Sequence, residues 1–316
     1  MDSQQGQPSA SPERNPRRKV LAAIVAGIVV CGALIGYVLY TQSGASKSPS
    51  STVIVAGDLV TMNYTGRLPD GKVFDTSIYS IAVNNATYPK SLTFSIRDAS
   101  SYTPFNMTAG KYGIGGTIKG FALGVIGMQE GDHETIEVVP GDGYEVNANL
   151  THWQMLHEEV PMTERLSTSE FSEAFETSPV PMAILPHYFW KWDVQVVEIL
   201  AGTVLIKHIP TVGQVVYPFG NPDDSANPAG WPVKVLEYDE IEGMITVEHG
   251  LSPEDVYNVK GMDIDGKTII VTAYNSDNGT FQVGKSDPSL GYNAEIAGRT
   301  LYFEVTIIKV TRAEAD

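Results

Sequence analysis

Residues 20–40 form an uninterrupted apolar stretch, VLAAIVAGIVVCGALIGYVLY, that contains no charged side chain. A helix rises about 1.5 Å per residue, so this stretch is long enough to cross the roughly 30 Å hydrocarbon core of a bilayer. Basic residues precede it at Arg14, Arg17, Arg18 and Lys19. Because positive charge is retained on the cytoplasmic side of a membrane, we expect residues 1–19 to form a cytoplasmic tail and residues 20–40 a transmembrane anchor.

Other roles for this segment stay open. One is a cleaved signal peptide, although the apolar run is longer than a usual signal and Tyr37 and Tyr40 suit a membrane interface. Cys31 would suit a lipoprotein, and Arg17-Arg18 would suit twin-arginine export. We expect an uncleaved anchor, followed by a Ser-rich linker over residues 41–52 and then an extracytoplasmic main body.

The charge and the metal-ligand residues exclude several classes of function. The chain has a net charge of −16 at neutral pH, and its N-terminal tail is basic, so the remainder is more acidic than the whole. Such a surface repels phosphate backbones, and we expect no nucleic acid among the partners. The single cysteine excludes an intrachain disulfide and a thiolate metal centre. The histidines are scattered, with His152 and His157 off helical i, i+4 spacing, so we predict no metal site.

From residue 53 onward, short alternating runs are separated by glycine and proline, which is typical of β-strands and tight turns. The length suggests about two domains, and a change of character near residue 147 predicts a separate β-rich domain over residues 147–284. Strands are expected at residues 59–64, 135–139, 194–199, 204–208, 212–217, 232–236, 245–247, 268–274 and 300–310. Helices are expected at residues 118–128 and 167–176. The predicted fold class is α+β, mainly β.

Common catalytic templates do not fit. Gly113-Ile114-Gly115-Gly116 lacks the Gly-Lys-Ser/Thr of a phosphate loop and the spacing of a dinucleotide fold. The chain has no Gly-x-Ser-x-Gly elbow, and no Ser/His/Asp or Cys/His set stands out. Asp263-Ile264-Asp265-Gly266 begins like a calcium loop but lacks the later ligands, so we predict a hairpin turn there.

A series of short blocks carries more information as a set than any one block does alone. In chain order the blocks are Asn63-Tyr64-Thr65-Gly66, Asp70-Gly71-Lys72-Val73-Phe74-Asp75-Thr76-Ser77, Ile118-Lys119-Gly120-Phe121, Gly127-Met128-Gln129-Glu130-Gly131, Pro140-Gly141-Asp142-Gly143-Tyr144 and Leu301-Tyr302-Phe303-Glu304-Val305. In this order and spacing they resemble the FKBP-type peptidyl-prolyl cis-trans isomerases. The resemblance implies an antiparallel sheet wrapped on one short helix.

The last block lies far from the others in the sequence. Residues 293–301, NAEIAGRTL, resemble the segment that returns from the inserted flap in SlyD-like members of the family. This implies a discontinuous isomerase domain over residues 53–146 and 285–312. Residues 147–284 would then be an inserted flap domain, longer than that of SlyD, which acts as a chaperone in such relatives.

The resemblance also implies which residues form the site, an apolar pocket between the sheet and the helix. Its catalytic set would be Tyr64, Asp75 and Tyr144. Its substrate-binding set would be Phe74, Phe105, Ile118, Phe121 and Phe303. Phe94 competes with Phe105 for its place, because the loop before Ile118 is longer than usual. Phe121 stands where many relatives have tryptophan, and Thr117 and Glu145 also depart from the usual pattern.

Such a pocket explains why no nucleophile, metal or cofactor is expected. Rotation about an Xaa-Pro bond must break amide resonance across a barrier of about 18–20 kcal/mol. The twisted amide is less polar than the planar one, so a dry apolar pocket favours it over the ground state.

The expected activity is isomerisation, and the expected partners are unfolded or proline-containing polypeptides and, through the anchor, the cell membrane of a prokaryote. A holdase with a vestigial isomerase site is the alternative. A β-rich structural surface protein is a third hypothesis, which the set of Tyr64, Asp75 and Tyr144 disfavours.

Overall fold

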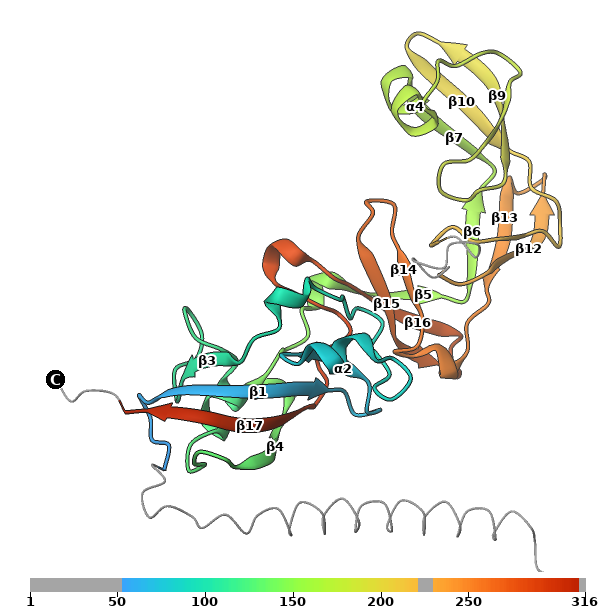
Figure 1. The fold of residues 1–316 in the computed structure, drawn as a ribbon. Coiled ribbons are helices and arrows are strands. Elements are labelled where there is room, and N and C mark those ends of the chain that lie inside the picture. Colours follow the sequence, from blue (N-terminus) through green and yellow to red (C-terminus); the bar gives the residue numbers. More distant parts are fainter. Residues whose placement is uncertain (1–52, 221–229, 313–316) are drawn as a thin grey trace, which may run out of the picture. The chain divides into compact units, whose positions relative to one another are not determined.

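The computed structural model describes residues 53–220 and 230–312 (Figure 1). The described residues belong to one compact unit of the chain. The predicted cytoplasmic tail, transmembrane anchor and Ser-rich linker lie outside the described residues. Within the described ranges, no helix has the length and apolar character needed to span a bilayer. The structure is mainly β with few helices, in agreement with the predicted class.

One antiparallel sheet joins the two ends of the described chain. Its strands run in the order β2 (Val73–Thr76), β1 (Leu59–Arg67), β17 (Leu301–Thr311) and β4 (His133–Val138), and β3 (Phe105–Thr108) pairs with the first half of β1. The register places Gly66 opposite Phe303 and Asp75. The first and last strands therefore lie side by side at the centre of the sheet (Figure 1).

A short helix, α3 (Lys119–Gly124), packs against β4. Two glycines allow this close approach: a Cβ at Gly120 would lie 2.7 Å from Val138 Cγ1, and one at Gly124 would lie 2.3 Å from Ile136 Cγ2. The predicted helix over residues 118–128 is too long, because the backbone leaves helical geometry after Val125 and reaches a positive φ at Gly127.

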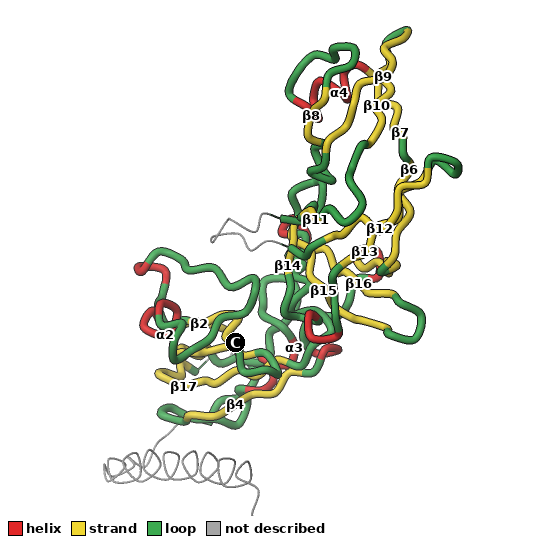
Figure 2. Tube along the Cα trace, turned by 90° about the vertical axis from the view of Figure 1, so that its right-hand side faces the viewer, coloured by secondary structure: helices red, strands yellow, loops and turns green. Residues whose placement is uncertain are grey.

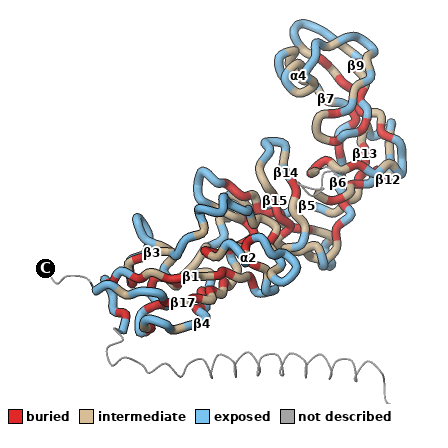
Figure 3. Tube along the Cα trace, viewed as in Figure 1, coloured by how far each residue is buried: buried red, intermediate tan, exposed pale blue. Residues whose placement is uncertain are grey.

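A buried cluster lies between this sheet and α3. Figure 3 shows the alternation of buried and more exposed residues along β1 and β17 that creates one apolar face. Its buried members include Ile54, Met62, Leu68, Phe121, Leu301, Phe303 and Ile307. Burial of these side chains contributes about 1.5–3 kcal/mol each, and it fixes the sheet on which the candidate site is built.

Two further helical pieces, α2 (Tyr79–Val83) and the 3-10 turn at Ala99–Ser101, lie in the long connection from β2 to β3. Glu295, which is fully buried, anchors this connection from the returning segment. Its carboxylate accepts hydrogen bonds from the backbone N–H groups of Leu92 and Thr93, both at 2.7 Å. The connection is thus held by residues that follow the insert in sequence.

Between β4 and β17, the described chain forms three four-stranded antiparallel sheets with a core of their own (Figure 2). The first contains β5 (Thr151–Met155), β16 (Thr280–Lys285), β15 (Thr268–Asn275) and β14 (Lys260–Met262). The second contains β6 (His157–Pro161), β13 (Met244–His249), β12 (Val233–Asp239) and β11 (Val215–Val216). The third contains β7 (Thr163–Ser167), β10 (Thr203–His208), β9 (Asp193–Leu200) and β8 (Ile184–Pro186). Helix α4 (Thr168–Phe175) begins at Ser167 with a capping box.

These three sheets are copies of one unit. In each, a polar edge strand pairs with the second strand of a hairpin at the same register, His152 with Val283, Glu158 with Val247 and Glu164 with Ile206. In each hairpin, the first strand has a β-bulge at the equivalent position, where one residue has no partner in the second strand. These residues are Thr272, Leu236 and Val197. We name the copies outer (β5), middle (β6) and inner (β7), because their hairpins return in reverse order along the chain.

The repeat has a sequence signature that the strand-by-strand analysis missed. Trp192 and Trp231 each begin a Trp-x-Val-x-Val run, and a glycine with positive φ, Gly202 or Gly243, precedes the strand that ends in His208 or His249. In the outer copy, lysines occupy the positions of the tryptophan and the histidine. The turn at Asp263–Gly266 joins β14 to β15 by two backbone hydrogen bonds, as predicted.

Candidate functional site

Five aromatic rings from five different elements meet on the apolar face of the first sheet. Phe121 of α3 stacks on Phe303 of β17 with ring centroids 4.5 Å apart, and Phe74 of β2 meets Phe303 edge-on at 5.6 Å. Tyr64 of β1 lies 5.6 Å from Phe105 and 6.0 Å from Phe121. We call this group, Tyr64, Phe74, Phe105, Phe121 and Phe303, the aromatic cluster.

The aromatic cluster has a buried floor and more exposed walls. Phe121 and Phe303 are 3% and 5% exposed, whereas the other rings are half-buried. Ile118, at the start of α3, and Tyr144, after the Pro-Gly-Asp-Gly turn, pack against the same core. The structure therefore gathers all the apolar and aromatic residues that the sequence proposed for the site.

Of the two phenylalanines proposed for the same place in the substrate-binding set, Phe105 contacts the aromatic cluster and Phe94 does not. Phe105 contacts Tyr64 and stacks near Phe121, with centroids 6.3 Å apart. The Phe94 ring lies 5.4 Å from the Lys90 ammonium and is not among the rings packed on this core. Phe105 reaches the aromatic cluster because β3 pairs with β1, placing Phe105 opposite Met62.

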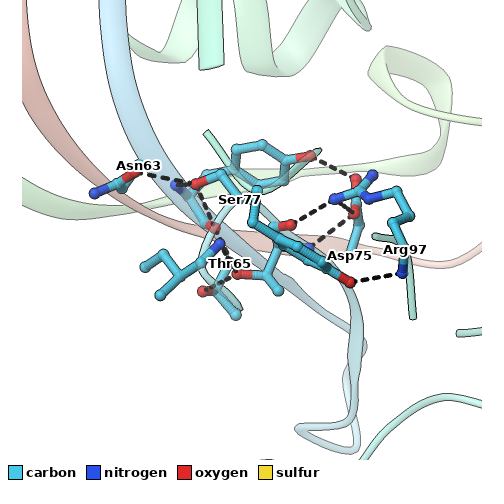
Figure 4. A network of polar contacts seen from close by, with 9 residues as sticks. Asn63, Thr65, Asp75, Ser77 and Arg97 are labelled. Carbon is cyan, nitrogen blue, oxygen red and sulfur yellow. Dashed lines mark hydrogen bonds and ion pairs between the residues drawn. The ribbon is translucent and has the colours of Figure 1, made fainter. Parts of the chain in front are cut away.

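A polar pair lies at the edge of the aromatic cluster. The Tyr64 hydroxyl donates to Asp75 Oδ2 at 2.5 Å, and the Arg97 guanidinium lies 3.2 Å from Asp75 Oδ1 (Figure 4). The Arg97 guanidinium also donates to the Thr76 carbonyl at 2.7 Å, and the Arg97 backbone N–H donates to the Tyr102 hydroxyl at 2.9 Å. These bonds fix the carboxylate against the tyrosine that forms one side of the aromatic cluster.

Arg97 is the member of this group that sequence reasoning missed. It lies in the long connection before β3, where no periodic pattern marks any position. The only available signal was that it is the sole arginine between Arg67 and Arg165 in a strongly acidic chain. The side chains of Arg97 and Asp75 are 44% and 36% exposed, so burial of the carboxylate gave no further signal.

Hydroxyl groups beneath the pair join β1 to β2. Ser77 Oγ accepts a hydrogen bond from the Tyr64 backbone N–H at 2.9 Å, and the Thr65 and Thr76 hydroxyls lie 3.0 Å apart (Figure 4). Both threonines are buried. This network sets the distance between the strand that bears Tyr64 and the strand that bears Asp75.

Both tyrosines of the site retain their protons at neutral pH. Burial raises the pKa of Tyr64 above its ordinary value, and the Asp75 charge raises it further. Burial also raises the pKa of Tyr144, with a smaller effect from Asp75. The Tyr64 proton is engaged by Asp75, whereas the Tyr144 hydroxyl has no hydrogen-bond partner within residues 53–220 and 230–312. Tyr144 is therefore the phenol that can donate to a bound molecule.

Gly66 gives the Phe74 ring its place. A Cβ at Gly66 would lie 2.6 Å from Phe74 Cζ and 2.8 Å from Phe74 Cε1. We expect Gly66→Ala to push the ring from the aromatic cluster and to lower the free energy of unfolding by about 1–3 kcal/mol. Gly141→Ala is the control, because no atom lies within 4 Å of a Cβ there and the backbone φ is not positive. Urea unfolding of both variants checks this; equal midpoints would contradict it.

In the inner copy of the insert, Glu164, His187 and His208 place potential metal ligands within 4.8 Å of one another. Their hydrogen bonds argue against a metal there. His208 Nδ1 accepts from Trp192 Nε1 at 2.9 Å, and His187 Nδ1 accepts from the Trp190 backbone N–H at 3.0 Å. A neutral imidazole that accepts at Nδ1 carries its proton on Nε2, so neither Nε2 offers the lone pair that a metal requires.

Comparison with known proteins bears on the first sheet. Residues 51–158 match the family described as FKBP-type peptidyl-prolyl cis-trans isomerase. Over 92 residues, the chain is 36% identical to a protein of Methanocaldococcus jannaschii described as "Short-type peptidyl-prolyl cis-trans isomerase", a match that covers 29% of this chain and 51% of the relative. The chain thus spans about half the length of this curated relative.

The matched segment contains most of the candidate site. Residues 51–158 are similar to FKBP-type domains and supply Tyr64, Phe74, Asp75, Phe105, Ile118, Phe121 and Tyr144 of the candidate site. The family match ends within β6, so β17, with Phe303, and most of the insert lie beyond it.

Proposed function

We propose that this protein is a peptidyl-prolyl cis-trans isomerase whose active site is the aromatic cluster with Asp75 and Tyr144. The observation that carries the proposal is the geometry of the cluster: a buried Phe121–Phe303 floor, half-buried aromatic walls and, at the rim, the Tyr144 hydroxyl, which has no hydrogen-bond partner among the residues that the structure describes. The family match over residues 51–158 supports it.

The chemistry follows from the change in polarity during rotation. A planar Xaa-Pro amide loses its charge separation as it twists, and the barrier is about 18–20 kcal/mol. The proline ring would lie on Phe121, between Phe74 and Phe303, where water is excluded. A site complementary to the twisted, less polar amide lowers the barrier without any covalent step.

Polar groups at the rim would hold the substrate backbone while one bond rotates. The Tyr144 hydroxyl would donate to one substrate carbonyl, and the Ile118 backbone N–H, which donates no hydrogen bond within the described residues, to another. Asp75, held by Tyr64 and Arg97, would face the carbonyl that turns. Fixing both flanking carbonyls makes rotation about the central bond the only motion left to the peptide.

We propose a second activity for the insert, the binding of unfolded polypeptide, on the basis of its exposed apolar side chains. Trp153 and Met155 of β5 are 53% and 56% exposed, and Met182 is 66% exposed. Aromatic and methionine side chains of this kind suit promiscuous apolar contacts. The other tryptophans, Trp190, Trp192 and Trp231, are buried in the core of the insert, so only part of the aromatic content serves such a surface.

We also propose that residues 20–40 anchor the protein in a cell membrane with the main body on the extracytoplasmic side. The length of the apolar run and the basic residues before it support this proposal. The clients would then be exported or membrane-associated polypeptides, and the insert would hold them near the isomerase site and raise their effective concentration there.

A refolding experiment separates the two activities. The full chain is added to a model protein whose refolding is limited by one Xaa-Pro bond, and refolding rate and aggregation are recorded together. We expect the slow phase, which takes tens to hundreds of seconds uncatalysed, to accelerate at least several-fold at substoichiometric enzyme. Suppressed aggregation with an unchanged rate would instead show a holdase and refute the proposed isomerase.

A further inference from the structure

The inner copy of the insert contains a cavity that the isomerase site does not use. Its volume is about 260 Å³, enough for one side chain or a small molecule. Its lining residues come mainly from β7, β10 and the loop between β8 and β9. Its wall includes one carboxylate, two histidines and three aromatic rings: Glu164, His187, His208, Tyr188, Phe189 and Trp190.

The Glu164 carboxylate is held in place by two donors. The Tyr188 hydroxyl donates to Oε1 at 3.0 Å, and His187 Nε2 donates to Oε2 at 3.1 Å. The His187 hydrogen bond lowers the pKa of Glu164, so the carboxylate is charged at neutral pH. Each oxygen retains a lone pair, and the side chain is 31% exposed, so it can accept from a further donor.

The two histidines add no positive charge to this wall. Both Nδ1 atoms accept hydrogen bonds, from Trp192 Nε1 to His208 and from the Trp190 backbone N–H to His187. Protonation at Nδ1 would set two N–H groups against each other. Burial lowers the pKa of His208 to about 4. The Lys191 ammonium is bonded to the Tyr188 carbonyl and does not line the cavity, so the wall has a net negative charge.

The middle copy shows what is special about the inner one. There, Trp231 Nε1 donates to His249 Nδ1 at 2.9 Å, and His249 Nε2 donates to Glu158 Oε2 at 3.1 Å. These two hydrogen bonds connect the tryptophan, the histidine and the glutamate in a chain. In the inner copy, the equivalent His208 Nε2 lies 3.8 Å from Glu164 Oε2, beyond hydrogen-bond distance. Glu164 Oε2 instead accepts a hydrogen bond from His187 Nε2. The buried His208 N–H is thus left at the cavity wall, and the carboxylate is turned toward His187 and Tyr188.

We infer that this cavity binds an organic cation, the ammonium or guanidinium group of a basic side chain or of a small amine. A charged group there would meet the Glu164 carboxylate in a charge-assisted hydrogen bond, beside the aromatic side chains that line the cavity. The rigid support of Glu164 by Tyr188 and His187 means that no side chain must be reordered when the ligand binds.

Calorimetric titration of the full chain at physiological salt tests this. The probes are N-acetyl-arginine amide, spermidine and, as the neutral counterpart of the first, N-acetyl-citrulline amide. We expect saturable one-to-one binding of a cationic probe and none of the citrulline derivative. Glu164→Gln should weaken binding roughly tenfold or more. Binding of the arginine derivative alone identifies a polypeptide side chain as the ligand, and binding of spermidine alone a small amine.

Glu158→Gln is the matched control, because it removes the same charge at the same register position in the middle copy. An equal loss in both variants would show that net charge, not this cavity, attracts the probes, and would overturn the inference. Unchanged binding by Glu164→Gln, or failure of both cationic probes, would do so as well. If circular dichroism shows that Glu164→Gln is unfolded, equal affinity of the wild type for arginine and citrulline probes is the refuting result.

Discussion

Asp75→Ala should lower kcat/KM for Xaa-Pro isomerisation roughly thirtyfold, since a hydrogen bond to a charged group contributes about 1.5–3 kcal/mol. The substitution releases the Tyr64 hydroxyl and leaves the Arg97 guanidinium at the edge of the aromatic cluster without the carboxylate that faces it. An unpaired cation there would favour the planar, polar amide over the twisted one. A proline-containing tetrapeptide assayed with the full chain provides the measurement.

Two further variants separate charge from shape. Asp75→Asn keeps an acceptor for Tyr64 and should lose less activity than Asp75→Ala. Asp70→Ala removes a carboxylate that pairs with Lys72 in the turn before β2, and it should leave the rate unchanged. If Asp70→Ala and Asp75→Ala reduced the rate equally, the general acidity of this face, and not the Tyr64–Asp75 pair, would be the cause.

The second large effect is acid lability of the insert. His208 has a folded-state pKa of about 4, against an ordinary value of 6.5, because burial disfavours its charged form. Between about pH 4 and pH 6.5, His208 is therefore protonated in the unfolded chain but not in the folded chain. Stability is fully present above pH 6.5 and falls as the pH drops toward 4, by about 3 kcal/mol at 1.36 kcal/mol per pKa unit.

Urea unfolding followed by tryptophan fluorescence at pH 7 and pH 4.5 measures this loss. His208→Gln retains an acceptor for Trp192 Nε1 and removes the titration, so its midpoint should change less with pH than that of the wild type. His157→Gln is the control, because His157 is exposed and pairs only loosely with Glu248 at 3.4 Å. The same acid dependence in the wild type and His208→Gln would exclude His208 as the source.

The elements that the sequence predicted well are those with apolar alternation. β1, β4, β9, β10, β12, β13, β15 and β17 all lie at expected positions, and α4 begins within a residue of the predicted helix. α3 is shorter than predicted because the backbone leaves helical geometry after Val125 and reaches a positive φ at Gly127. The expected strand over residues 212–217 shrinks to Val215–Val216.

The triplicated unit was missed for a different reason. Its edge strands, β5, β6 and β7, are polar and follow one another directly, whereas their hairpins return later in reverse order. A nested repeat has no fixed sequence period, so a search for tandem copies does not find it. The Trp-x-Val-x-Val runs at Trp192 and Trp231 and the closing histidines are the residues that could have revealed it.

For the candidate site, motif spacing pointed to the residues that the structure brings together, Phe105 included. What spacing could not supply was the partner of Asp75. Arg97 reaches it across a long connection whose path depends on contacts such as those of Glu295 with Leu92 and Thr93. Such contacts join residues far apart in sequence and leave no local pattern.

The most direct test of the central claim is the exchange rate of an Xaa-Pro peptide at equilibrium. Magnetisation-exchange NMR on a proline peptide, with and without the full chain, reports cis-trans interconversion without any coupled protease or folding step. We predict catalysed exchange on the sub-second scale, against tens to hundreds of seconds for the free peptide, and a strong reduction in Asp75→Ala. Line shapes that show binding but no accelerated exchange would contradict the isomerase assignment.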